Sequence, residues 1–151
     1  MLGNIKSLAI VGLAVGLLGL GGYASASGTT EKSTNPMKVI YHVNDSANAV
    51  DAMRNANNHL ETDPTAKLTF VTHAKGVDFL LEGAMDKDGN PYNIAVEKLI
   101  AKGVTFDICN ITLVRRKIDP KTALSGVKFV PSGVVEIAKL QAQEGFVYLK
   151  P

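Results

Sequence analysis

The stretch Val104-Thr-Phe-Asp-Ile-Cys109-Asn-Ile-Thr-Leu113 is an apolar strand pattern that runs directly into a turn and a short helix. It carries the only cysteine among the 151 residues, at the point where the strand ends. In an open parallel α/β sheet, ligands and chemistry gather at the carboxyl ends of the strands. Cys109 is therefore the first candidate for a functional residue, and the neighbouring segments are expected to form its scaffold.

Strand-like and helix-like segments alternate along the chain on both sides of this stretch. Apolar runs predict strands at residues 38–43, 67–72, 104–108, 127–130 and 146–149. No two-residue hairpin signal separates any of these runs. The pattern predicts a three-layer α/β/α fold: a mostly parallel, flavodoxin-like sheet of five strands with helices on both faces and right-handed crossovers.

Helical spacing and capping residues predict the elements between the strands. Ala49, Met53, Ala56 and Leu60 recur on one face of a helix that follows the capping residues 44–46. Residues 74–76 are expected to turn the chain into a short helix at 77–81, and another short helix is expected at about 113–117.

Two further helices complete the expected pattern. Asn90 is predicted to cap a helix that has Pro91 at its first position and ends at Lys102-Gly103. The last helix is expected to run through residue 142. Its core side should carry Ile137 and Leu140, with Val134 or Ala138 beside them.

Residues 1–26 have the pattern of a secretory signal peptide. Lys6 is their only charged side chain, and an uncharged apolar run leads to the small-x-small site Ala24-Ser25-Ala26. The run is shorter than the ~20 residues of a usual membrane-spanning helix. We therefore expect cleavage and a periplasmic location, with an uncleaved inner-membrane anchor as the alternative. Residues 27–35 would form a linker and residues 36–151 a single domain.

Composition narrows the classes of partner. The formal net charge is +2, and removal of Lys6 with the signal would lower it by one. Such a nearly neutral protein offers no large basic surface, and it contains no tryptophan for base stacking, so nucleic acid is not an expected partner. A single cysteine cannot form an intramolecular disulfide. In an exported protein, an unpaired thiol is either intermolecular or reactive.

Polar residues follow several of the predicted strands. Because parallel strands place their carboxyl ends at one edge, Asn44, His73, Cys109, Asn110 and Ser132 are expected to share that edge. They define a candidate site around the thiol.

Two interpretations of Cys109 remain open at this point. Free cysteines often pack as small buried hydrophobic residues. Alternatively, the N–H groups of the following short helix, with Arg115 and Arg116 behind it, would favour the thiolate and make Cys109 reactive.

Other chemistries have weak sequence support. His73 could act as a base for a cysteine hydrolase, but no local hydrolase signature surrounds Cys109. His42, His73 and Cys109 lack the close spacing of metal ligands. Asp86-x-Asp88-x-Asn90 resembles the start of a calcium loop, but Pro91 stands where the loop glycine belongs, which favours a surface turn. No nucleotide-binding glycine motif is present, and no cofactor is expected.

Three segments resemble the DsrE/DsrF-like family of sulfur-relay proteins. They are Cys-Asn-Ile-Thr-Leu at 109–113, Val-Pro-Ser-Gly-Val-Val-Glu at 130–136 and Gly-Phe-Val-Tyr-Leu-Lys-Pro at 145–151. The opening Val-Ile-Tyr-His-Val-Asn and the Asn55-Ala-Asn-Asn58 helix are similar as well. The resemblance spans residues 36–151. It implies a five-stranded α/β domain that assembles into homotrimers or hexamers, and a persulfide carried on Cys109.

These observations lead to two hypotheses of different classes. The first is an exported sulfur carrier or sulfurtransferase in which Cys109 holds sulfane sulfur, while Asn110, Thr112 and backbone N–H groups stabilise the anionic sulfur. Its donor and acceptor would be a protein or a small thiol. The second is a non-catalytic oligomeric module that binds a small anion or a protein partner, with Cys109 in a structural role.

Overall fold

The computed structural model describes residues 35–151, so the predicted signal peptide and most of the linker lie outside the described residues. In the described part, the strands are β1 (Lys38–Asp45), β2 (Lys67–Lys75), β3 (Thr105–Cys109), β4 (Lys128–Val130) and β5 (Val147–Leu149). The α-helices are α1 (Ala49–Thr62), α2 (Tyr92–Ala101), α3 (Asn110–Arg116) and α4 (Gly133–Glu144). Short 3-10 turns span Ser46–Asn48, Asp78–Leu80 and Pro120–Thr122.

The five strands form one sheet in the order β4-β3-β2-β1-β5, and every neighbouring pair is parallel. This confirms the predicted α/β class and the number of strands. The order differs from the flavodoxin order 2-1-3-4-5. Here β1 to β4 lie side by side in chain order, and the last strand returns to the free edge of β1.

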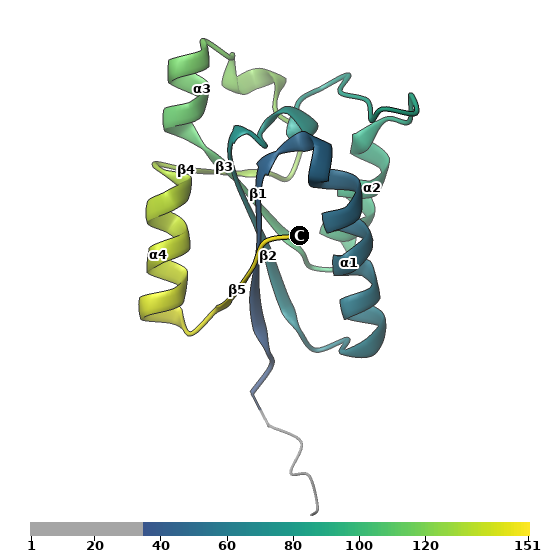
Figure 1. The fold of residues 1–151 in the computed structure, drawn as a ribbon, viewed down its shortest axis with the longest axis vertical. Helices are drawn as coiled ribbons and strands as arrows, with labels where there is room; N and C mark the ends of the chain where they lie inside the picture. The colour runs from purple at the N-terminus through teal and green to yellow at the C-terminus, as the bar shows by residue number, and fades with distance from the viewer. Residues whose placement is uncertain (1–34) are drawn as a thin grey trace, which may run out of the picture. The chain divides into compact units, whose positions relative to one another are not determined.

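Helices cover both faces of the sheet, as the three-layer prediction requires (Figure 1). Side chains alternate along β1, so Tyr41 and its same-face neighbours join the large core under α1 and α2. Ile40 points the other way and packs with Val71 of β2 and Leu140 of α4. The α4 face therefore has a much smaller apolar core than the opposite face.

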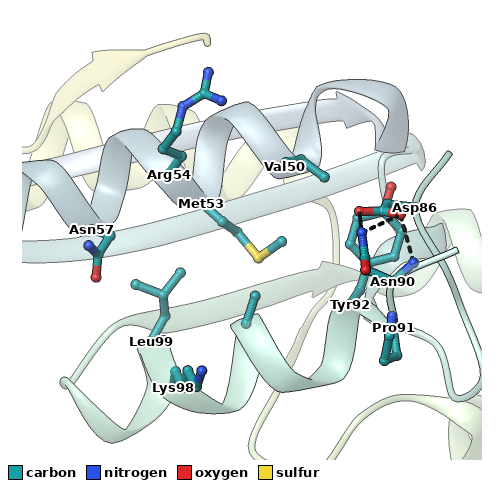
Figure 2. A pocket seen from close by; sticks show the side chains of 11 residues that line it. Val50, Met53, Arg54, Asn57, Asp86, Asn90, Pro91, Tyr92, Lys98 and Leu99 are labelled. Atoms are coloured by element: carbon teal, nitrogen blue, oxygen red, sulfur yellow. Dashed lines mark hydrogen bonds between the residues drawn. The ribbon is translucent and has the colours of Figure 1, made fainter. Parts of the chain in front are cut away.

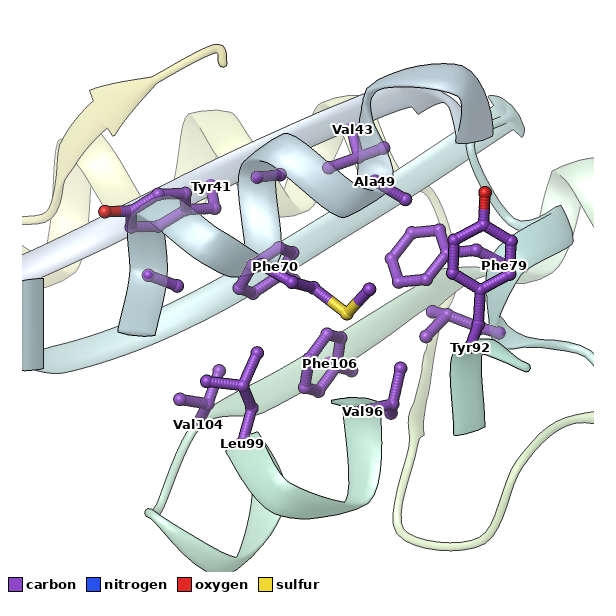
Figure 3. Packing of buried hydrophobic residues seen from close by; sticks show 14 of the residues in the cluster. Tyr41, Val43, Ala49, Phe70, Phe79, Tyr92, Val96, Leu99, Val104 and Phe106 are labelled. Atoms are coloured by element: carbon purple, nitrogen blue, oxygen red, sulfur yellow. The ribbon is translucent and has the colours of Figure 1, made fainter. Parts of the chain in front are cut away.

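The large core is centred on aromatic rings from neighbouring strands (Figure 3). Phe106 of β3 stacks on Phe70 of β2 with ring centroids 4.6 Å apart, and meets Phe79 edge-on at 6.3 Å. All three side chains are fully buried. On α1, Ala49, Met53 and Ala56 are buried as predicted, whereas Leu60 is only partly buried.

Strand β2 is longer than predicted. Residues 74 and 75 continue the strand instead of turning away from it, and the turn comes at Gly76. A Cβ at Gly76 would lie 2.0 Å from the carbonyl oxygen of Val43, so only glycine fits this close approach of the backbones. The extension moves Ala74 to the edge where the thiol lies.

The start of α2 also differs from the prediction. Pro91 stands just before the helix in an extended conformation, and no side chain caps the first turn. Asn90 instead donates its backbone N–H to Asp86 Oδ1 at 2.8 Å, which closes the preceding loop. This loop forms a turn, and among residues 35–151 no group of three or more acidic, histidine or cysteine side chains is placed to hold a metal ion. The predicted helix end at Lys102-Gly103 is confirmed, with Gly103 at φ 88°.

The boundaries of α3 and the exposed side of α4 are corrected as well. α3 begins at Asn110, three residues earlier than expected, directly after the strand. On α4, Leu140 is buried and Ile137 partly buried, but Val134 and Ala138 are both exposed. No helix within residues 35–151 is long and apolar enough to cross a membrane.

A buried carboxyl group lies under α4. Asp107 is 5% exposed, and burial, with the negative charge of Glu136, raises its pKa to about 6 although Lys128 and Lys139 oppose the shift. Its folded pKa lies above the ordinary value of 3.8, so the folded state retains the proton more readily. Protonation of Asp107 therefore stabilises the folded state. This stabilisation is fully present below pH ~4 and is lost as the pH rises through about 6.

Asp107→Asn should therefore stabilise the fold at pH 8 and have little effect at pH 3.5. The gain at pH 8 should reach up to ~3 kcal/mol, because each pKa unit corresponds to about 1.4 kcal/mol. Urea unfolding of both proteins at the two pH values measures it. Asp88→Asn, in the exposed loop, is the matched control for the loss of one surface carboxyl group. Equal effects of Asp107→Asn at both pH values would contradict the prediction.

Candidate functional site around Cys109

Cys109 is the last residue of β3 and the N-cap of α3. Its backbone is still extended, at φ −71° and ψ 113°, and the next residue is already helical. This abrupt change directs the N–H groups of the first turn of α3 toward the cysteine side chain. The register of the sheet pairs Cys109 with Val130 of β4, just before the segment that leads into α4.

The thiol is buried yet surrounded by hydrogen-bond donors. Cys109 is 4% exposed, and this burial alone would raise its pKa. The Thr112 hydroxyl and the backbone N–H groups of Gly133, Thr112 and Ile111 donate to the sulfur, and together they lower the pKa below its ordinary value. The two interpretations of Cys109, as a packed residue and as a thiolate site, therefore each describe part of this environment.

Thr112 connects the thiol to the end of β2. Its Oγ1 accepts a hydrogen bond from the N–H of Ala74 at 3.1 Å. With this lone pair engaged, the hydroxyl proton remains available to the sulfur. Ala74 adopts φ 52°, in the left-handed region that residues other than glycine rarely occupy. The surroundings thus hold Ala74 in a strained conformation, and its N–H orients the Thr112 hydroxyl.

The two arginines of α3 have different surroundings. Arg116 donates to the carbonyl oxygen of Ala74 at 2.8 Å and pairs with Asp78 at 2.6 Å. It holds the end of β2 against α3, away from the thiol. Arg115 alone lines the cavity in which Cys109 lies. The expectation that both arginines lie at the thiol is therefore wrong for Arg116, and a positive charge from Arg115 on the thiol stays a prediction.

The cavity around Cys109 has a volume of about 250 Å³. It is lined by side chains from β2, β3, α3 and the start of α4: His73, Cys109, Ile111, Thr112, Arg115, Ser132 and Val134. Of the residues predicted from the sequence, the structure thus brings together five. Asn44, Asn110 and Arg116 do not line the cavity. Asn44 lies instead against Gly76 at the neighbouring strand ends.

Gly133 is a site residue that the sequence did not single out. A Cβ there would lie 3.1 Å from the carbonyl oxygen of Thr72, 3.2 Å from His73 Cβ and 3.4 Å from Cys109 Cβ. The absent side chain allows the start of α4 to approach both strands, so that its N–H reaches the sulfur. The available signal was a glycine, rather than a good helix former, in the first turn of a helix.

His73 is one end of a chain of rings on the α4 face of the sheet. Its Nε2 lies 2.7 Å from Nε2 of His42, and Nδ1 of His42 lies 2.6 Å from the hydroxyl of Tyr148. Burial lowers the pKa of His42 to about 4, helped by the positive charges of His73 and Lys150, and burial and Lys150 also lower the pKa of His73. The weak metal-site hypothesis placed His42, His73 and Cys109 together, but they form no three-ligand group in the described chain.

A larger groove lies elsewhere, between α1 and α2 (Figure 2). Its volume is about 360 Å³, and Met53 and Leu99 contribute apolar walls. It is lined by neither cysteine nor histidine, and Asp86 at one end is engaged with Asn90. Although larger, this groove contains no thiol, so chemistry at a thiol can be placed only in the Cys109 cavity.

Removing the Thr112 hydroxyl should make the thiol less acidic. A hydrogen bond to a charged group contributes about 1.5–3 kcal/mol, so Thr112→Val should slow alkylation by iodoacetamide at least roughly tenfold at mildly acidic pH. Thr112→Ser retains a hydroxyl and is the matched control. The rate of alkylation against pH, followed by intact mass, measures the effect. Equal rates for the valine and serine variants would show that the hydroxyl does not stabilise the thiolate.

Comparisons with known proteins agree with this architecture. The structure of a protein of unknown function, MTH1491 from Methanobacterium thermoautotrophicum, superposes with a TM-score of 0.68 at 26% identity, covering 76% of this chain and 99% of that one. The ychN protein from E. coli has a TM-score of 0.62 at 18% identity, with 78% and 99% covered, and shares the fold. No curated protein matches the sequence. The DsrE/DsrF-like family matches residues 37–151, and the chain therefore belongs to this family, which is generally related to sulfur relay.

Proposed function

We propose that this protein carries sulfane sulfur as a persulfide on Cys109, taking it from a donor and passing it to an acceptor. One observation carries the proposal: the only thiol of the chain ends a strand in a cavity, beside the Thr112 hydroxyl and backbone N–H groups from the starts of α3 and α4 that favour its thiolate. Such donors stabilise an anion, which is the reactive form of both a thiol and a persulfide. Membership of a sulfur-relay family supports the same chemistry.

The reaction requires no cofactor and no net oxidation. The Cys109 thiolate attacks the outer sulfur of a donor persulfide, R–S–SH, so that a new S–S bond forms and the bond to R–S breaks. The products are Cys109–S–SH and the thiolate R–S⁻, which takes up a proton to become R–SH; the proton of the Cys109 thiol is released earlier, when the thiolate forms. Thr112 and the N–H of Gly133 would hold the anionic sulfur, and Arg115 would add positive charge in the cavity.

The second candidate function is a non-catalytic binding module. The 4% exposure of Cys109 favours it, because a packed thiol could simply support a cavity that binds a small anion through His73 and Arg115. The two functions differ in whether the sulfur can be reached by a reagent in the folded protein.

Intact mass after incubation with glutathione persulfide tests the proposal. We expect the native protein to gain the mass of one sulfur atom, and dithiothreitol to remove it. Protein previously blocked with iodoacetamide is the control and should gain nothing. If the folded thiol accepts neither sulfur nor iodoacetamide, and alkylates only after denaturation, the sulfur-carrier proposal fails and the binding module is favoured.

Cellular location and assembly belong to the same proposal. Export to the periplasm would place residues 36–151 outside the cytoplasm, and the amino-terminal sequence of protein from a native periplasmic fraction tests it. A homo-oligomer, trimer or hexamer, would cover large apolar side chains that the described chain leaves exposed. Those on β4, α4 and β5 are Phe129, Val134, Val135, Val147, Tyr148 and Leu149. Light scattering that shows only monomer at micromolar concentration would contradict such assembly.

A further inference from the structure

Two histidines and a tyrosine link the Cys109 cavity to the exposed edge of the sheet. His73 lines the cavity, its Nε2 contacts Nε2 of His42 at 2.7 Å, and Nδ1 of His42 contacts the hydroxyl of Tyr148 at 2.6 Å. Tyr148 is 39% exposed on β5. We propose that these three side chains form a neutral proton relay, in which His73 exchanges protons with sulfur in the cavity while His42 and Tyr148 set its tautomer.

The chain of contacts permits two arrangements of protons. In the first, the Tyr148 hydroxyl donates to His42 Nδ1, His42 Nε2–H donates to His73 Nε2, and Nδ1 of His73 carries a proton that it can give away. In the second, every hydrogen bond is reversed, and Nδ1 of His73 is an acceptor. His73 can therefore act as an acid or as a base, and neither ring becomes an imidazolium.

Charges around the pair favour these neutral forms. His42 and His73 lie on the same face of β1 and β2, close enough that a positive charge on one opposes a positive charge on the other. Lys150, after β5, adds a fixed positive charge near both rings. Arg115 from α3 shares the cavity with His73, and the only other titratable group there is Cys109. A cationic histidine is thus disfavoured from several directions, whereas a shift of tautomers changes no charge.

Sulfur transfer gives this relay a task, so the inference rests on the proposed function. When the Cys109 thiolate attacks R–S–SH, the leaving sulfur departs as R–S⁻ and must gain a proton. An alkyl thiolate is a basic leaving group, and protonating it assists the cleavage of the S–S bond. His73 would give this proton from Nδ1, while Tyr148 and His42 pass a proton from solvent to His73 Nε2 and so reset its tautomer. Atoms and electrons balance without an oxidant or a reductant.

Reagents with different leaving groups test whether His73 supplies that proton. With glutathione persulfide, the leaving thiolate is basic, and His73→Asn should slow transfer by roughly 10²-fold, as for loss of a general acid. With methyl methanethiosulfonate, the leaving methanesulfinate needs no proton, so the same variant should react at the native rate. His42→Phe should slow only the persulfide reaction, and by less, because His73 remains.

The two reagents also separate a catalytic role from a structural one. An unchanged rate with methyl methanethiosulfonate shows that the variant retains the folded site and its thiolate. Equal slowing of both reactions would indicate a structural role for His73 and overturn the inference. Unchanged rates in both reactions would overturn it as well.

A second measurement is independent of sulfur transfer. Nitrogen-15 spectra of the imidazoles in the native protein should show both rings neutral at pH 7, with a proton on only one of the two facing Nε2 atoms. Tyr148→Phe should change the Nδ1 resonance of His42. Two rings that titrate independently near pH 6.5, or spectra unaffected by Tyr148→Phe, would overturn the relay. If Cys109 accepts no sulfur but these spectra are as expected, the proposed function fails while the hydrogen-bonded chain stands.

Discussion

Cys109→Ser is expected to abolish both sulfur uptake and alkylation, because no other cysteine exists in the chain and a hydroxyl cannot form a persulfide. The fold should be retained, since serine is nearly isosteric with cysteine. The hydroxyl can use the donors that now point at the sulfur, from Thr112 and the N–H of Gly133. We therefore expect the free energy of unfolding to change by no more than about 1 kcal/mol. Intact mass and urea unfolding of the two proteins measure the two halves of this prediction.

The combination of results is what identifies the role of the residue. Loss of sulfur uptake with a stable fold assigns the chemistry to Cys109. A variant that unfolds would instead show that the cysteine is needed for packing, and would favour the binding module. Cys109→Ala is a useful companion because it leaves the donors from Thr112 and Gly133 without an acceptor, and it should be less stable than the serine variant.

Phe106→Ala is expected to cost roughly 3–5 kcal/mol of stability, the usual range for removing a fully buried phenylalanine. The ring lies in the middle of the larger core, between Phe70 and Phe79, and the surrounding strands cannot collapse into the space it leaves. The free energy of unfolding of a typical domain is only about 5–15 kcal/mol. This variant should therefore unfold at a much lower urea concentration, or fail to accumulate as folded protein.

Phe106→Leu is the matched comparison for this effect. Leucine fills more of the space than alanine, so its loss of stability should be clearly smaller. Phe106 lies on the α1 and α2 face of the sheet, opposite the side that carries Cys109, so the leucine variant should keep the native rate of thiol alkylation. Equal destabilisation by leucine and alanine would show that the aromatic stacking, rather than the filled volume, is what stabilises this core.

The fold was predictable from sequence because its signals are local and repeated. Alternating strand and helix patterns identified all five strands, and buried Ala49, Met53 and Ala56 followed from helical spacing. The strand order could not be predicted in this way, since nothing in the last strand specifies which free edge it joins. The end of β2 was misplaced because Ala74 adopts a left-handed conformation that its side chain does not favour.

The candidate site was predictable in part for a related reason. Parallel topology places strand ends at one edge, which brought His73, Cys109 and Ser132 together correctly. The contribution of Gly133 depends on backbone approach, and the direction of Arg116 depends on its pairing with Asp78. The contact between His42 and Tyr148 joins residues 106 positions apart, so no local pattern could reveal it.

The return of β5 to β1 also has a consequence for how the chain assembles. Strands β1 to β4 can form in the order of synthesis, each step closing a moderate loop, whereas β5 must close almost the whole domain. Hydrogen exchange during refolding should accordingly protect β2 and β3 before β5. Until β5 pairs with β1, Tyr148 makes no contact with His42. The helix α4, which lies between β4 and β5 in the chain, is not yet held at its carboxyl end. The thiol would then have all the groups that favour its thiolate only in a completed chain. A nascent or truncated polypeptide would carry Cys109 without the groups that α4 and β5 supply.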